Sequence, residues 1–185
     1  MTLPKFEYLS RLEVCIEPAL KLWLKHLRYP VSRLYRKIFE GKYLNTKLPD
    51  VHDLNELKRV LGEVTCTLEL LDRISYPEAV WAKKRDDCDG FAILCADRLY
   101  TLDGVEDIKL VTAITKPVKN SHTVCTFFDL HLEKYRYFDN AYLVERGFES
   151  REDIVDDMIS KRRSHVLCWD VVEPQTLKQI EYHSQ

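Results

Sequence analysis

Apolar residues recur at three- and four-residue steps through the first third of the chain, which is the period of an amphipathic helix. Pro18 is expected to break or kink the first such helix, over residues 9–27. Pro30 then separates it from a second, shorter helix over residues 31–39, and another helical pattern covers residues 53–74. The apolar stripe of the first helix consists of Leu9, Leu12, Ile16, Leu20, Trp23, Leu24 and Leu27.

The pattern changes in the second half, where β-branched and aromatic residues gather in short runs. Strands are predicted over residues 108–115, 123–129 and 135–139, and the last two are close enough in sequence to form a hairpin. A helix over residues 151–161 and a final strand over residues 166–172 follow. Helices first and antiparallel strands later predict an α+β fold with a helical N-terminal half.

Length and composition are those of one globular domain. The chain has 185 residues, of which 45 % are hydrophobic and 31 % are charged. We therefore expect a single domain over residues 1–185, made of a core over residues 51–185 and a basic helical extension over residues 1–50. The six cysteines include no C-x-x-C pair, which disfavours a zinc knuckle.

The net charge of −2 is unevenly distributed along the chain. Residues 1–47 contain ten Lys/Arg and four Asp/Glu, a net charge of +6, and the remainder carries −8. The basic segment either meets an acidic partner or forms solvated helix faces, and nucleic-acid binding through it is a weaker alternative. No apolar run is long enough for a membrane span, and charged residues interrupt the first 18 positions. We therefore expect no secretory signal and a cytoplasmic protein.

The strongest chemical candidate is a cysteine at the start of a predicted central helix. Residues 86–99 have the sequence DDCDGFAILCADRL, in which small and apolar residues follow Cys88 at helical steps. Cys88 is therefore expected in the first turn, where free backbone N–H groups lower a thiol pKa and can hold an oxyanion. Three neighbouring aspartates oppose this effect on the pKa. The alternative is a buried structural cysteine, which is what we expect of Cys95.

A general base, and a group that orients it, are needed to activate such a thiol. His122 stands just before the strand over residues 123–129, and His165 is its best competitor. Asp139 ends the second strand of the predicted hairpin. A hairpin brings the end of its second strand near the start of its first, so Asp139 and His122 are expected within about three residues of direct opposition.

The order of these residues and their flanking sequences resemble the transglutaminase-like cysteine proteinase superfamily. DDCDGFAILCADRL is similar to the nucleophile motif of that family, SHTVCTFF to the strand that carries its histidine, and YRYFDN to the strand that ends in its aspartate. YPEAVWAKK resembles the aromatic-Pro-Glu segment that precedes the cysteine. The resemblance covers residues 74–140, and it departs from the family at Asp86, where a glycine is usual.

This resemblance implies a papain-like fold, a triad of Cys88, His122 and Asp139, and Tyr76 or Trp81 as a second hydrogen-bond donor to the oxyanion. Such a triad transfers or hydrolyses the acyl group of a peptide, isopeptide or carboxamide bond. It would act on a protein or peptide substrate, and no cofactor is implied. Hydrolysis and transamidation share every step except the acceptor.

Besides the nucleic-acid binder named above, two alternatives to an enzyme stay open at this point. The first is a catalytically silent module of the same fold that serves interaction or structure. The second is a metal site, for which Asp87, Cys88, His122 and Asp139 offer ligand atoms of suitable types.

Overall fold

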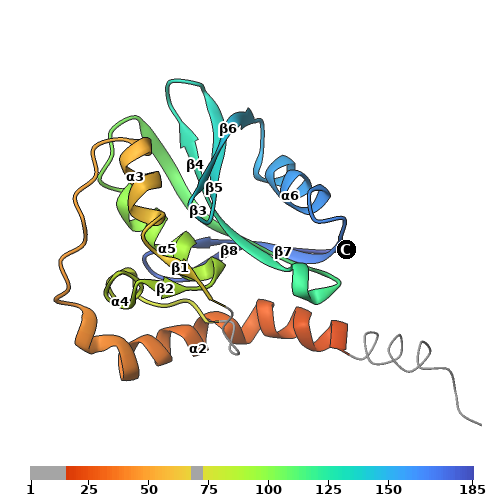
Figure 1. Ribbon diagram of the computed structural model, residues 1–185. Coiled ribbons are helices and arrows are strands. Elements are labelled where there is room, and N and C mark those ends of the chain that lie inside the picture. Colours follow the sequence, from red (N-terminus) through yellow and green to blue (C-terminus); the bar gives the residue numbers. More distant parts are fainter. Residues whose placement is uncertain (1–15, 68–72) are drawn as a thin grey trace, which may run out of the picture.

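An antiparallel sheet of six strands forms the centre of the molecule (Figure 1). The computed structural model describes residues 16–67 and 73–185. The strands lie in the order β6-β5-β4-β3-β7-β8, so consecutive hairpins lead from β3 to one edge, and β7 and β8 complete the other side. The strands are β3 (Val105–Lys116), β4 (His122–Asp129), β5 (Lys134–Asp139), β6 (Tyr142–Phe148), β7 (His165–Glu173) and β8 (Lys178–Ser184).

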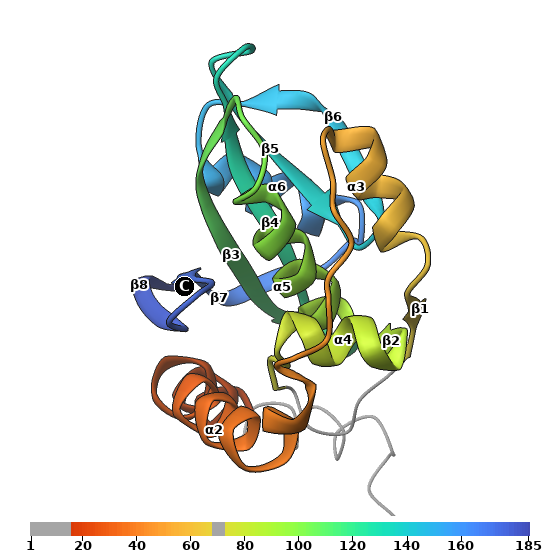
Figure 2. The ribbon, with the colours of Figure 1, turned by 90° about the vertical axis from the view of Figure 1, so that its left-hand side faces the viewer.

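Helices cover both faces of the sheet (Figures 1 and 2). On one face lies α5 (Cys88–Leu99), with α3 (Leu54–Leu61) and α4 (Pro77–Lys83) beside it, and on the other lies α6 (Arg151–Ser160). Two hydrophobic cores result, one between the sheet and α5 and one between the sheet and α6. The α+β class predicted from the sequence is therefore confirmed.

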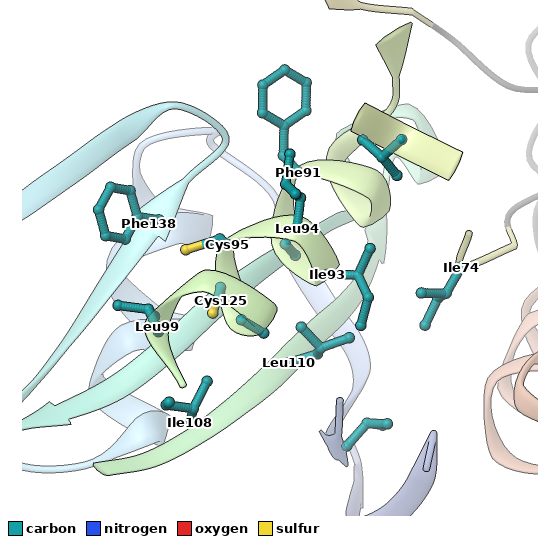
Figure 3. Packing of buried hydrophobic residues seen from close by; sticks show 14 of the residues in the cluster. Ile74, Phe91, Ile93, Leu94, Cys95, Leu99, Ile108, Leu110, Cys125 and Phe138 are labelled. Atoms are coloured by element: carbon teal, nitrogen blue, oxygen red, sulfur yellow. The ribbon is translucent and has the colours of Figure 1, made fainter. Parts of the chain in front are cut away.

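The larger core forms where α5 packs against β3, β4 and β5 (Figure 3). Cys95 lies there beside Cys125 and Phe138 and is fully buried, as predicted. Small residues on the same helix, Ala92 and Ala96, let its backbone approach the strands. This close packing fixes the position of the first turn of α5, where Cys88 lies.

Residues 16–40 form one continuous helix, whereas the sequence predicted two helices separated at Pro30. The break expected at Pro30 does not occur, and residues 9–15 of the first predicted helix, on the N-terminal side of Pro18, lie outside the described residues. A proline inside a helix removes one hydrogen bond and crowds the carbonyl four residues before it. A wider π-helical turn directly precedes the segment that contains Pro30 and accommodates its ring. Helical structure covers residues 16–40, with π-helical turns at Trp23–Leu27 and Arg36–Glu40 on either side of α2 (Arg28–Tyr35), before a 3-10 turn at Gly41–Tyr43.

The helix predicted over residues 53–74 is also wrong in its extent. It begins with α3, which Asp53 caps by accepting hydrogen bonds from the backbone N–H groups of Asn55 and Glu56, and it ends at Gly62. The next residues form the short strand β1 (Thr65–Cys66), which pairs in parallel with β2 (Arg85–Asp86). The rest of the predicted helix lies partly outside the described residues.

The other predicted elements are confirmed. Residues 108–115, 123–129, 135–139 and 166–172 lie in β3, β4, β5 and β7, and residues 151–161 match α6. Among the described residues, the strands β1, β2, β6 and β8 and the helix α4 were not predicted. Within residues 16–67 and 73–185, no helix combines the length and the apolar character needed to cross a membrane.

Candidate active site

Cys88 is the first residue of α5, as the sequence predicts. Asp87 caps the helix by accepting a hydrogen bond from the Asp89 N–H, with 3.0 Å between the atoms. The capping residue uses one of the N–H groups that a helix start leaves without an intrahelical partner. The Cys88 N–H belongs to the same first turn, where such a group can donate to an acyl oxygen that develops charge.

Close packing between Asp86 and Gly90 explains part of the motif around Cys88. Asp86 is buried, and its carboxylate accepts a hydrogen bond from the Asp87 N–H at 3.0 Å. A Cβ placed on Gly90 would lie only 2.2 Å from the Asp86 Cβ. Asp86 is therefore packed against the glycine two residues after the cysteine.

A buried ion pair joins the N-terminal helix to the first turn of α5. Arg28 Nη2 lies 2.6 Å from Asp89 Oδ1, and both side chains are almost completely buried. The Arg28 guanidinium also donates hydrogen bonds to the hydroxyls of Thr112 at 2.7 Å and Thr123 at 3.3 Å. One side chain of the long helix thus ties α5 to β3 and β4 within one residue of the thiol.

The environment of Cys88 favours the neutral thiol. Burial raises the pKa of the Cys88 thiol well above its ordinary value, and the charges of Asp89 and Asp87 raise that pKa further. A hydrogen bond from the Thr123 backbone and the charge of Arg28 act in the opposite direction without reversing the shift. The thiol therefore needs a general base before it can act as a nucleophile near neutral pH.

His122 and Asp139 form the pair predicted for such a base. His122 Nε2 lies 2.7 Å from Asp139 Oδ1, and Arg162 Nη2 lies 3.2 Å from the other carboxylate oxygen. Cys125 pairs with Phe138 in the β4–β5 ladder, which puts residue 124 opposite Asp139. His122 is two residues further along the same face, so the hydrogen bond joins diagonal neighbours.

The surroundings of Asp139 keep it ionised. Burial alone would raise the pKa of Asp139, but the hydrogen bond and charge of His122 and the charge of Arg162 outweigh it and lower that pKa to about 2. A carboxylate that accepts from Nε2 fixes the neutral imidazole with its proton on that nitrogen. The lone pair of His122 is then on Nδ1, the ring nitrogen that can accept a proton.

Cys88 and His122 line one cavity of about 420 Å³, which lies where β4 begins. Within residues 16–67 and 73–185 no hydrogen bond joins the two side chains; the thiol lies 4.0 Å from Asp89 Oδ1. Alternation along β4 turns Thr123 and Cys125 toward α5 and Val124 toward α6, so His122 begins the strand on the α6 side. The imidazole and the thiol therefore belong to opposite faces of the sheet and meet the same cavity where β4 begins.

The two predicted oxyanion donors lie away from this cavity. Tyr76 caps the start of α4 and lines a separate cavity of about 230 Å³, with the Arg36 guanidinium over its ring. Trp81 packs against the core, and the Lys84 ammonium lies over its indole. Neither residue is among those that line the cavity of Cys88. Their role as oxyanion donors stays a prediction.

Several residues that line the cavity were not singled out from the sequence. They come from the long helix, the segment around β1, the turn after β5 and the segment after α6, and they include Leu20, Trp23, Cys66, Thr67, Asn140 and Arg162. Of these six, only Asn140, the last residue of YRYFDN, belongs to a motif described above. Trp23 and Leu20 are members of the helical stripe, whose spacing indicates burial but not which surface it faces.

The ligand set considered for a metal is only partly brought together. Asp87, Cys88 and Asp89 place one potential ligand atom each within 4.8 Å of one another. Among the described residues, His122 and Asp139 do not join this group. His122 and Asp139 pair with each other instead, and Asp139 also pairs with Arg162. In comparisons with family models and with curated proteins, nothing matches the chain.

Proposed function

We propose that this chain is a cysteine enzyme with a papain-like, transglutaminase-like fold, which transfers or hydrolyses acyl groups of protein or peptide substrates. The observation that carries the proposal is the 2.7 Å hydrogen bond between His122 and an ionised Asp139, beside the cavity that Cys88 lines. A cysteine at a helix start, a histidine and a carboxylate that orients it are the parts of an activated nucleophile.

In this mechanism His122 Nδ1 accepts the proton of the Cys88 thiol, and Asp139 stabilises the imidazolium. The thiolate attacks the carbonyl carbon of a carboxamide, and the oxyanion accepts a hydrogen bond from the Cys88 N–H. The C–N bond then breaks, and the imidazolium gives its proton to the leaving amine. Water or an acceptor amine attacks the thioester, loses its proton to His122, and releases the thiol.

A catalytically silent module is the second candidate, and two observations favour it. Burial and the charges of Asp89 and Asp87 raise the pKa of the Cys88 thiol, and no hydrogen bond joins that thiol to His122 among the described residues. Catalytic hydrogen bonds are often long without substrate and shorten in the complex. Reactivity of the thiol therefore separates the two candidates.

The test is the rate at which each cysteine reacts with iodoacetamide near neutral pH, followed by mass spectrometry of the digested protein. Cys66 is the matched control because it lines the same cavity and is exposed. We expect Cys88 to react at least about tenfold faster than Cys66, and His122→Ala to remove that difference. Cys88 reacting no faster than Cys66, or His122→Ala leaving its rate unchanged, would favour the silent module.

The acceptor is identified with the same protein. Release of 4-nitroaniline from peptide 4-nitroanilides measures hydrolysis, and incorporation of a fluorescent primary amine into casein measures transamidation. Loss of either signal in Cys88→Ala, with Cys66→Ala as control, assigns it to this site.

A further inference from the structure

The long helix turns its polar side inward. The buried positions after Leu24 include Arg28, Ser32, Arg36 and Glu40, spaced by four residues. Each has a partner inside the molecule: Arg28 pairs with Asp89, Ser32 accepts from the Ile74 N–H at 3.0 Å, and Arg36 donates to two backbone carbonyls. Glu40 pairs with Lys83 at 2.7 Å. The row of polar residues is therefore the side of this helix that is buried inside the molecule.

The apolar side of the same helix faces outward. Because two of its turns are π-helical, the long helix averages close to four residues per turn. Residues on the side away from the molecule therefore form two adjacent rows along the helix. Six large apolar side chains lie there, and Leu34 and Ile38 are each 60 % exposed. The six are Leu22, Leu27, Val31, Leu34, Ile38 and Phe39, which we call the outer apolar face. Apolar residues clustered on one surface mark a binding site more often than scattered ones do.

Positive charge borders this face. Residues 18–39 contain six Lys/Arg and no Asp/Glu. Two of the cations, Arg28 and Arg36, are buried on the inner side. Each of the other four cations occupies the position directly after a residue of the inward-facing row. They therefore lie between that row and the outer apolar face, along one of its borders. They are Lys21, Lys25, Arg33 and Lys37. Lys21 pairs with Glu17 at 3.1 Å and Arg33 donates to the Leu177 carbonyl at 2.8 Å, so Lys25 and Lys37 carry most of the charge offered to an occupant. An occupant of this face must combine apolar surface with negative charge.

A second copy of the chain does not meet that requirement. Its own residues 18–39 offer no carboxylate, so two copies joined through this face would bring cations together without counter-charges. A protein groove suits a narrow stripe of anchors, whereas the outer apolar face is two rows wide and convex. The helix lies along one end of the molecule, and no described element lies beyond it (Figures 1 and 2).

We propose that residues 18–39 dock the protein on a membrane surface that contains anionic lipid, with the helix lying in the plane of the interface. The outer apolar face enters the boundary between headgroups and acyl chains, and the bordering cations meet the lipid phosphates. Leu20 and Trp23 of the same helix line the cavity of Cys88, so docking brings that cavity close to the lipid surface.

The test is cosedimentation of the full chain with vesicles of phosphatidylcholine, or of phosphatidylcholine and phosphatidylglycerol in equal amounts. We expect binding to the mixed vesicles that weakens as salt is added, and little binding to phosphatidylcholine alone. Leu34→Asp with Ile38→Asp should lower the partition coefficient at least about tenfold. Leu130→Asp with Leu132→Asp is the matched control, because those side chains are similarly exposed in the β4–β5 turn at the far end of the molecule.

The charged border is tested separately. Lys25→Glu with Lys37→Glu should weaken binding to the mixed vesicles about tenfold or more, while Lys58→Glu with Arg59→Glu, an equal change of charge on α3, should not. Circular dichroism of each variant establishes that it is folded. Failure of the wild-type chain to bind mixed vesicles at low salt overturns the proposal. A dimer in solution that Leu34→Asp dissociates overturns it in favour of a second copy. Neither result bears on the reactivity of Cys88, which the alkylation rates measure.

Discussion

The buried Arg28 guanidinium pairs with Asp89, the residue after the candidate nucleophile Cys88. Breaking a buried ion pair destabilises a protein because the remaining charge is left buried without a partner. Replacing Arg28 by Met leaves Asp89 buried without its cation, and we expect this to lower the free energy of unfolding by about 3–5 kcal/mol. Urea denaturation followed by tryptophan fluorescence measures it. Lys37→Met, at an exposed position of the same helix, is the control and should change stability by less than about 1 kcal/mol.

Removing both partners distinguishes an ion pair from general packing. Arg28→Met combined with Asp89→Leu leaves no unpaired charge at this position in the interior, so the double variant should recover most of the stability that Arg28→Met loses. The midpoint of urea denaturation is again the measurement. A double variant as unstable as the sum of the single ones would show that the two side chains act independently.

Because Asp139 is ionised in the folded protein, the free energy of unfolding is expected to change with pH in the acid range. Its pKa is lowered from 3.8 to about 2, so the stability that it contributes is fully present above about pH 4 and is lost as the pH falls through about 2. The contribution to the free energy of unfolding is at most about 2.5 kcal/mol. Asp139→Asn should therefore be less stable than the wild type at pH 5, and the difference should shrink towards pH 2. Urea denaturation over that range measures it, and a constant difference would contradict the assignment.

At the scale of single elements, the start of α5 depends on the space between Asp86 and Gly90. Alanine favours a helix over glycine by about 1 kcal/mol, but at position 90 its Cβ would collide with Asp86. We expect Gly90→Ala to destabilise the fold by about 1–3 kcal/mol. Thermal unfolding measures this, and Gly41→Ala is the control because nothing lies within 4 Å of its Cβ position.

The clash has a specific remedy. Asp86→Gly removes the side chain that the added methyl group would meet, so it should make room for Gly90→Ala and recover much of the melting temperature that this substitution loses. A Gly90→Ala chain that melts at the same temperature with and without Asp86→Gly would show that another contact sets the cost.

The elements differ in how far the sequence predicts them. Strands β3, β4, β5 and β7 are rich in buried β-branched and aromatic residues, so their period is visible. β6 and β8 are the edge strands, and their polar and charged residues hide the alternation that marks a strand. Pro30 predicts a break in the long helix that does not occur, because the π-helical turn that relieves the strain at this proline has no pattern in the sequence.

At the scale of the whole molecule, the pair of His122 and Asp139 was predictable because a hairpin joins them and limits the register. The walls of the cavity were not, since Trp23 and Arg162 reach it from opposite ends of the chain. The same limit applies to Arg28. From the sequence, an arginine in an amphipathic helix is expected on the solvated face. Only the packing of the long helix on β3 and β4 shows that Arg28 has buried partners.

The long separations of these partners have a consequence for the newly synthesised chain. Arg28 precedes Thr112 by 84 residues and Thr123 by 95, and its neighbour Tyr29 precedes Asp170 by 141. On the ribosome the long helix can form early, but its buried charge lacks these partners until β3 and β4 have been translated. The packing of that helix against β3 and β4, which completes the wall of the cavity, is therefore a late event in biosynthesis. Until then the nascent chain exposes both an apolar and a cationic face, the features by which chaperones retain unfinished proteins.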